Sequence, residues 1–234
     1  MSNSYFNFKQ FSIKQERSAF KVGTDSVVLG AYMDITGAKR ILDIGTGTGL
    51  LALMAAQKSS ADIIALEADR DSCNQAIENF AASRWSDRLT AINQRIQEFP
   101  GIGEKFDVIV SNPPYFSNSL KNPDSRKASS RHNDSLSFVE LVQAVGKFLS
   151  AHGRFWVIIP ANEAGKMVNA AEKIPLYPEK MLKIYPKPNS RVSRIIYSFS
   201  SNKRDIFEEE ITVEEATRHH YTAKYRELTK DFYL

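Results

Sequence analysis

The sequence predicts an α/β fold with a doubly wound, mostly parallel sheet of seven strands, the last two of which form a C-terminal antiparallel hairpin. Short β-branched runs alternate with helical patterns, as is typical of parallel sheets covered by helices. The final two runs are joined by a connection too short for a parallel crossover, so we expect them to pair antiparallel. No internal repeat or flexible linker interrupts the pattern, which favours one domain over residues 1–234.

Strands are expected where apolar runs lie between turn-prone residues. The five runs expected to form the parallel part of the sheet are 40–44, 61–68, 89–94, 106–111 and 153–160. Residues 181–186 and 192–200 flank the turn-prone sequence Lys-Pro-Asn-Ser and form the expected hairpin.

Helices are expected between the strands, at residues 50–58, 70–83, 135–149 and 162–173. The first is rich in Ala and Leu and contains no helix breaker. Asp134 or Ser135 is the expected N-cap of the third, because their side chains accept hydrogen bonds from free backbone N–H groups. Residues 1–36 are an N-terminal extension, and residues 201–234 are expected to be a polar tail.

Composition excludes several classes of protein. The chain has 234 residues, of which 42% are hydrophobic and 25% charged, as in ordinary globular proteins. Its longest apolar runs are about seven residues, whereas a membrane span needs about 20, and no signal-peptide pattern opens it. A single cysteine, Cys73, cannot form an internal disulfide or a cysteine metal cluster. We therefore expect a cytoplasmic protein without a metal site or a membrane partner.

A glycine-rich loop connects the first strand to the first helix, in the sequence Leu-Asp-Ile-Gly-Thr-Gly-Thr-Gly at 42–49. Glycines let the backbone turn sharply and approach a ligand closely. The dinucleotide fingerprint needs its third glycine three residues after the second, but Gly47 and Gly49 are only two apart. This spacing disfavours a binding site for NAD. The other alternative is that the loop is a strand–helix turn that binds no ligand.

The loop, together with an acid at the end of the second strand, resembles the class I S-adenosylmethionine-dependent methyltransferases. The resemblance implies that Asp43 helps to position the methionine ammonium group and that the glycines abut the cofactor. It also implies that Glu67 accepts both ribose hydroxyls. The cofactor contacts carried over here are Asp43, Gly45, Gly47, Gly49 and Glu67.

The sequence Ser-Asn-Pro-Pro-Tyr-Phe follows the fourth strand at 111–116. The Asn112 side-chain oxygen and the Pro113 carbonyl are two acceptors for the two hydrogens of a planar NH₂ group. Holding these hydrogens turns the nitrogen lone pair toward a sulfonium methyl group, which allows direct transfer. Pro114 would stiffen the loop, and Tyr115 could stack on a flat substrate.

This motif resembles that of amino-methyltransferases acting on adenine N6, guanine N2 or a glutamine amide, and does not choose among them. A turn without chemistry is the structural alternative. A nucleic-acid base would have to be unpaired or flipped out to reach such a pocket.

Charge is distributed unevenly, although 31 basic and 27 acidic residues leave a formal charge of only +4. The stretch 180–204 holds seven Lys or Arg and no acid, and the N-terminal segment mixes basic and aromatic residues such as Phe8 and Phe11. Such patterns are typical of nucleic-acid binders, and solvated strand faces are the alternative. If the fold is right, the basic stretch lies toward the same strand ends as Asn112. The candidate RNA contacts are Arg126, Lys127, Arg131, Lys183, Lys187, Arg191 and Arg194.

Segments outside the two motifs resemble the bacterial tRNA1(Val) adenine-37 N6-methyltransferases over nearly the whole chain. These segments are residues 20–32, 126–132, 134–142, 185–199 and 225–234. The resemblance implies that residues 1–36 form part of the cofactor pocket, with Lys21, Asp25 and Asn112 as cofactor contacts. It implies methylation of the adenine immediately 3′ to the anticodon of a valine tRNA. We separately expect the protein to be a monomer.

One position departs from the pattern of related enzymes. They usually carry Asp-Ile after the third strand, where the acid accepts from the adenine amine of the cofactor, whereas this chain has Arg95-Ile96. Arginine only donates, so we expect Gln94 or Gln97 to accept instead, or Ile96 to supply apolar contacts.

Two other functions stay open. The same motif would suit a methyltransferase acting on a protein glutamine or on rRNA guanine, although a free amide substrate would not need a basic surface. The second open function is that of a non-catalytic relative that only binds RNA. The intact Asn-Pro-Pro-Tyr motif argues against this function.

Overall fold

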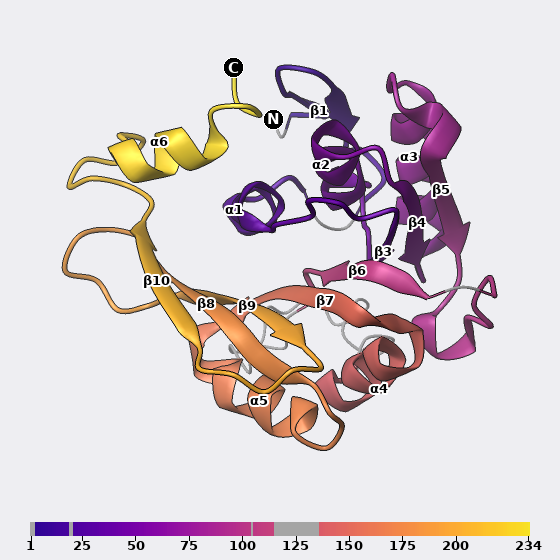
Figure 1. Cartoon of the computed structure of the whole chain (residues 1–234). Coiled ribbons are helices and arrows are strands. Elements are labelled where there is room, and N and C mark those ends of the chain that lie inside the picture. Colours follow the sequence, from indigo (N-terminus) through magenta and orange to yellow (C-terminus); the bar gives the residue numbers. More distant parts are fainter. Residues whose placement is uncertain (1–2, 19–20, 104, 115–135) are drawn as a thin grey trace, which may run out of the picture.

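An eight-stranded sheet forms the centre of the molecule (Figure 1). A computed structural model describes residues 3–18, 21–103, 105–114 and 136–234. The sheet has the order β10-β8-β9-β7-β6-β3-β4-β5. Its strands are β3 (Arg40–Ile44), β4 (Asp62–Glu67), β5 (Leu89–Asn93), β6 (Phe106–Ser111), β7 (Leu149–Pro160), β8 (Tyr177–Tyr185), β9 (Arg194–Ser200) and β10 (Phe207–Thr212).

Most strand pairs are parallel, as predicted. β3 pairs in parallel with β4 and β6, and the parallel pairing continues to β5 and β7. The predicted hairpin is confirmed, because β9 runs antiparallel to β8 and also to β7.

The prediction of seven strands was wrong, because β10 adds an eighth. β10 pairs in parallel with β8 and comes from the segment 201–234 that was expected to be a polar tail. Its sequence, Phe-Glu-Glu-Glu-Ile-Thr, buries only Ile211. An edge strand with one buried side chain lacks the apolar alternation that identifies strands in a sequence.

Helices cover both faces of the sheet (Figure 1). In Figure 1, α1, α2 and α3 lie above the sheet, and α4 and α5 lie below it. The helices are α1 (Thr24–Tyr32), α2 (Leu50–Lys58), α3 (Arg70–Ala81), α4 (Phe138–Phe148), α5 (Ala164–Ala171) and α6 (Ala223–Thr229). The sequence missed α1 and α6.

The N-cap predicted for α4 was also wrong. The Ser137 hydroxyl accepts from the Glu140 N–H at 3.2 Å, and the Glu140 carboxylate accepts from the Ser137 N–H at 2.8 Å. This reciprocal capping box satisfies two free N–H groups, so α4 starts after Ser137.

Two hydrophobic cores lie on opposite faces of the sheet, and the central strand β7 contributes to both. Trp156 and Ile158 belong to the core under α1 and α2, whereas Phe155, Val157 and Ile159 belong to the core under α4 and α5. All five are fully buried. Burial on both faces explains why this strand reads as a continuous apolar run.

The N-terminal residues form a small hairpin of β1 (Tyr5–Asn7) and β2 (Ser12–Lys14) beside the C-terminal end of the chain (Figure 1). Phe8 stacks on Phe11 at a centroid distance of 4.7 Å and on Tyr233 at 5.9 Å. Phe8 and Phe11 are buried. Packing between the two ends therefore accounts for Phe8 and Phe11, so these two rings are not exposed to RNA.

Among the residues that the structure describes, no helix is long and apolar enough to cross a membrane.

Candidate active site

The carboxyl ends of β6, β3, β4 and β5 meet at one edge of the sheet. The strand register places Ile44 opposite both Ser111 and Leu66, and Glu67 opposite Asn93. From β3 the chain continues to β4 and β5 on one side, and later to β6 and β7 on the other. Ligands of open α/β sheets bind at such a switch point, outside the carboxyl ends of the strands.

A cavity of about 540 Å³ opens at this switch point. It gathers the residues that follow four strand ends and the segment that leads into α1. The predicted site residues that line it are Lys21, Asp25, Gly45, Gly47, Glu67, Ile96, Asn112, Pro113 and Pro114. Residues separated by up to 93 positions in the chain are thus brought to one place.

The glycine loop forms one wall of the cavity, with φ of +57° at Gly47 and +86° at Gly49. Side chains rarely adopt this left-handed conformation. A Cβ atom on Gly47 would meet no atom within 4 Å, so it would project into open space, whereas one on Gly49 would lie 2.4 Å from Phe80 Cε1. Gly49 caps α2, does not line the cavity, and allows α2 to pack closely on α3.

Asp43 lies beneath this loop and does not line the cavity. It is fully buried, and its Oδ2 accepts a hydrogen bond of 2.5 Å from the Thr46 hydroxyl. Burial raises the pKa of Asp43 to about 7, although the bond from Thr46 opposes the rise. Asp43 therefore fixes the conformation of the loop through Thr46.

Glu67 ties the same loop to β4. Its Oε2 accepts from the Gly47 N–H at 2.8 Å, and its Oε1 accepts from the Asp69 N–H at 2.9 Å. Burial raises the pKa of Glu67, and these two bonds oppose the rise. The carboxylate is thus held at the cavity wall in a fixed orientation.

The Asn-Pro-Pro segment is anchored to its neighbouring strand and to α1. The buried Ser111 hydroxyl donates to the Ile44 carbonyl at 2.8 Å. Asn112 follows, and its Nδ2 donates to the Ser26 hydroxyl at 2.7 Å. Pro113 is buried and Pro114 is exposed. Tyr115 lies outside the described residues.

The residues after β5 form another part of the cavity wall. Gln94, Arg95, Ile96 and Gln97 all line the cavity. The Gln94 side-chain nitrogen donates to the Glu98 carbonyl, and that of Gln97 donates to the Glu140 carboxylate, each at 3.1 Å. The amide oxygen of each glutamine therefore lies on the side of its amide away from that contact.

Three predicted RNA contacts form ion pairs, among them Lys187, whose Nζ lies 3.9 Å from Glu214 Oε2. Arg194 Nε lies 2.7 Å from Asp25 Oδ2, which joins β9 to the first turn of α1. Lys183 Nζ lies 2.6 Å from Glu208 Oε2 on β10. The sequence predicted none of these pairings. Arg194 and Asp25, for example, are 169 positions apart in the chain.

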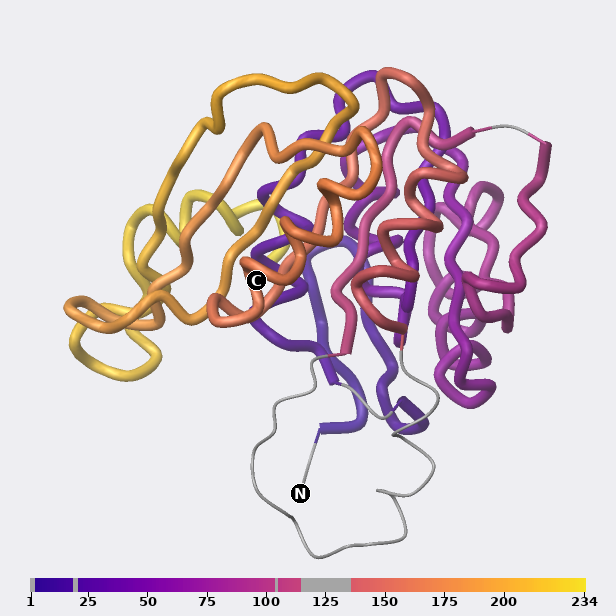
Figure 2. The backbone as a smooth tube through the Cα atoms, turned by 90° about the horizontal axis from the view of Figure 1, so that it is seen from below, coloured from indigo at the N-terminus to yellow at the C-terminus, as the bar shows by residue number. Residues whose placement is uncertain are grey.

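The basic stretch 180–204 is divided between the two ends of the sheet. Lys187 and Arg191 are exposed in a loop next to Arg194, which pairs with Pro160 at the carboxyl end of β7. This loop lies beside residues 213–222, since the Glu214 N–H donates to the Pro186 carbonyl at 3.0 Å (Figure 2). The expectation that this stretch lies toward the Asn112 end holds for this loop and for the neighbouring Lys183 and Arg194.

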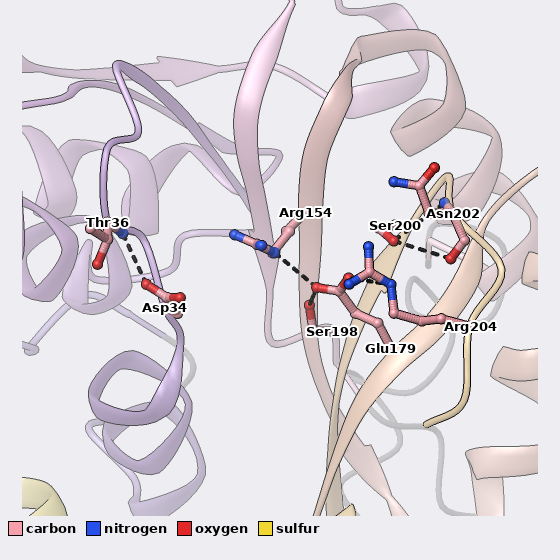
Figure 3. Close-up of polar contacts among 8 residues, drawn as sticks. All are labelled: Asp34, Thr36, Arg154, Glu179, Ser198, Ser200, Asn202 and Arg204. Carbon is pink, nitrogen blue, oxygen red and sulfur yellow. Dashed lines mark hydrogen bonds and ion pairs between the residues drawn. The ribbon is translucent and has the colours of Figure 1, made fainter. Parts of the chain in front are cut away.

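The remaining basic residues of the stretch, Lys180, Lys203 and Arg204, lie toward the other end. Arg154 Nε is 2.8 Å from the buried carboxylate of Glu179, and Arg204 Nε is 3.8 Å from it (Figure 3). Arg204 therefore helps to neutralise a buried acid. Arg126, Lys127 and Arg131 lie outside the described residues.

Sequence reasoning missed Ser26 and Thr46, which contact Asn112 and Asp43. A hydroxyl at position 46 lies inside the glycine motif, but only the fold brings Ser26 to Asn112, 86 positions away. Among the described residues, no group of three His, Cys, Asp or Glu side chains is placed to hold a metal ion.

The fold and the residues at its switch point define a class I methyltransferase. A model of the methyltransferase small domain family matches residues 17–170. A predicted O-methyltransferase from Agrobacterium tumefaciens has a similar fold, with a TM-score of 0.65 and 17% identity, covering 89% of this chain and 96% of that one.

Closer relatives narrow the class. A tRNA1(Val) (adenine(37)-N6)-methyltransferase of Bacteroides thetaiotaomicron is 44% identical over 236 residues, which cover 100% of this chain and 99% of the relative. One from Trichodesmium erythraeum is 44% identical over 238 residues, with the same coverage. The chain belongs to the family of tRNA1(Val) (adenine(37)-N6)-methyltransferases.

Proposed function

We propose that the protein transfers a methyl group from S-adenosylmethionine to the exocyclic N6 of adenine 37, immediately 3′ to the anticodon, in a valine tRNA. The observation that carries the proposal is the position of Asn112 and Pro113. They follow the strand next to the glycine loop and line the same cavity as Gly47 and Glu67. Full-length similarity to enzymes named for this reaction supports the substrate.

The cavity suits the proposed cofactor. A Cβ atom at Gly45 or Gly47 would meet nothing within 4 Å, so the glycine loop leaves open space beside its backbone. Glu67 presents a carboxylate there, which can accept from two hydroxyls. Gly45 and Gly47 would contact the cofactor, Glu67 would hold its ribose, and Lys21 and Asp25 would close the wall. Bound here, S-adenosylmethionine supplies an electrophilic methyl group on sulfur.

Three residues are available for the adenine end of the cofactor. Ile96 is buried at the cavity wall and offers apolar contact. Gln94 and Gln97 each have their amide nitrogen in a hydrogen bond, so each can present its oxygen to an amine. These contacts would replace the usual acid, where this chain has Arg95.

The substrate amine would be held by two acceptors. Asn112 Oδ1 and the Pro113 carbonyl would each accept one N–H of adenine N6, which turns the nitrogen lone pair toward the methyl group. The cofactor would supply the methyl group, and its C–S bond would break as the N–C bond forms. The methylated nitrogen is then acidic and releases a proton to water, so no strong base is required beforehand. Tyr115 would stack on the adenine, which must be flipped out to reach it.

The tRNA would approach the edge that holds the cavity. Lys187 and Arg191 are exposed there, and phosphate contacts from such residues supply non-specific affinity. Arg126, Lys127 and Arg131 are also proposed contacts. For Lys183 and Arg194 to contact RNA, their ion pairs with Glu208 and Asp25 would have to open. We also propose that the protein acts as a monomer in the cytoplasm.

Methyl transfer to defined RNA tests the proposal. We expect label from S-adenosylmethionine to enter an unmodified valine tRNA transcript, but not one in which adenine 37 is replaced by guanine. Asn112→Ala should lower kcat by about 10²-fold, the scale observed when one group that stabilises a transition state is removed. Label entering rRNA or a protein glutamine instead, or equal rates for wild type and Asn112→Ala, would contradict it.

A further inference from the structure

The contact between α1 and the Asn-Pro-Pro segment has a role that neither motif reveals. Asn112 Nδ2 donates to the Ser26 hydroxyl at 2.7 Å, and both residues line the cavity. We propose that Ser26 is a positioning residue that orients the Asn112 side-chain amide so that Oδ1, and not Nδ2, meets the substrate amine. This inference rests on the proposed methyl transfer.

The orientation of the Asn112 amide matters because the substrate amine can be held only by an acceptor. The oxygen and nitrogen of a planar amide lie on opposite sides of Cγ, so a bond from Nδ2 to Ser26 turns Oδ1 away from Ser26. A substrate NH₂ offers only hydrogens to the asparagine and therefore needs an acceptor. If the Asn112 amide flipped, its NH₂ group would face the substrate NH₂ group, and both would be donors. Of the two proposed acceptors, only the Pro113 carbonyl would remain.

Ser26 is well placed to act as a rigid support, because α1 is held at both ends. At its start, Asp25 pairs with Arg194 at 2.7 Å. At its end, Lys58 Nζ donates to the carbonyls of Gly30, Ala31 and Met33, at 3.1, 2.9 and 2.6 Å.

The middle of α1 is equally fixed. Val27, Val28 and Leu29 are fully buried, and a Cβ atom on Gly30 would lie 2.6 Å from Met54 Sδ. Side chains that orient a reacting group are most effective on such a rigid element.

The backbone that leads into Asn112 is also fixed. Ser111 pairs with Ile44 in the sheet and also donates its hydroxyl to the Ile44 carbonyl at 2.8 Å. The Ser26 contact restricts the rotation of the Asn112 side chain.

The first test replaces Ser26 by alanine, with Ser59→Ala as the matched control. Ser59 loses a hydroxyl bonded to the Ala55 carbonyl at 2.9 Å, at the far end of α2. Ser26→Ala should lower kcat about 10- to 50-fold, while the Kd of S-adenosylmethionine and the KM of tRNA stay within about twofold. This range is typical when a group that orients a functional side chain is lost. Ser26→Thr, which keeps the hydroxyl, should restore most of the activity.

The second test uses Asn112→Asp as a background. A carboxylate has two acceptor oxygens, so either orientation presents an acceptor to the amine. Adding Ser26→Ala to Asn112→Asp should therefore cost no more than about twofold to threefold. If the full loss persists in that background, or if Ser26→Ala behaves like Ser59→Ala, the proposal is overturned. If Ser26→Ala weakens cofactor binding and leaves kcat unchanged, Ser26 is a cofactor contact and the proposal also fails.

A third measurement does not depend on activity. In nuclear magnetic resonance spectra, exchange of the Asn112 side-chain amide hydrogens with solvent should be at least about tenfold faster in Ser26→Ala than in wild type. An inactive wild type with slow exchange would contradict the proposed function but not the contact. Equal exchange in both proteins would overturn the positioning role whatever the substrate.

Discussion

Gly47 and Gly49 are two positions apart in one motif, but the structure predicts different effects when each is replaced by alanine. Both have positive φ, +57° and +86°, so alanine costs about 1–2 kcal/mol of backbone strain at either position. The positions differ in what surrounds the new methyl group. At Gly47 it enters the open cavity, and at Gly49 it lies 2.4 Å from Phe80 Cε1.

At Gly49 the overlap with Phe80 adds a second contribution to the loss of stability. Phe80 is 3% exposed, so its ring cannot move into solvent, and overpacking of a core costs a further 1–3 kcal/mol or so. The Gly49→Ala variant should therefore lose about 2–5 kcal/mol in the free energy of unfolding. For a chain of this size each kcal/mol corresponds to roughly 2–4 °C in Tm, so we expect Tm to fall by about 4–20 °C.

Thermal unfolding and cofactor titration together separate the two variants. Gly47→Ala should lower Tm by no more than about 2–8 °C, from backbone strain alone, and should raise the Kd of S-adenosylmethionine at least about tenfold, because the methyl group occupies cofactor space. Gly49→Ala should bind the cofactor almost normally at temperatures where it is folded. A stable Gly49→Ala protein that no longer binds the cofactor would refute this division of roles.

Two other predictions concern charge. Burial raises the pKa of Asp43 to about 7, so between pH 4 and 7 this carboxyl ionises mainly in the unfolded chain, and stability falls over that range by up to about 4 kcal/mol. Asp43→Asn should remove that part of the slope in denaturant titrations, and an unchanged slope would contradict the assignment. For tRNA binding, Lys187→Ala and Arg191→Ala should each reduce the dependence of log K on log salt by about one. Lys203→Ala, at the far end of the sheet, should leave it unchanged, and equal effects of all three would mean that the loop does not direct RNA binding.

The central strands and the cavity were predictable because their signals are local. A strand buried on both faces is a mostly apolar run, so β3 and β6 were found with their observed bounds. Glycines and prolines at strand ends mark turns that the backbone requires. The resemblance to methyltransferases also implied that Gly47 and Asn112 contact one cofactor, and the structure brings both to one cavity.

Features that depend on distant contacts were not predictable. β10 is an acidic edge strand whose Glu209 accepts a 2.6 Å hydrogen bond from the Tyr32 hydroxyl on α1, 177 positions away. The basic residues Lys183 and Arg194 look available for RNA in the sequence, but the fold supplies each with a carboxylate. The same limit applies to Ser26, which only the fold brings to Asn112.

The most direct test of the central claim is mass analysis of nucleosides from valine tRNA, purified from cells that contain this protein and from cells that lack it. The account predicts N6-methyladenosine at position 37 in the first sample and unmodified adenosine at that position in the second. Restoring the gene with wild type, but not with Asn112→Ala, should return the methyl group. Identical valine tRNA in both cells, or a methyl group missing from a guanine or a protein glutamine instead, would contradict the account.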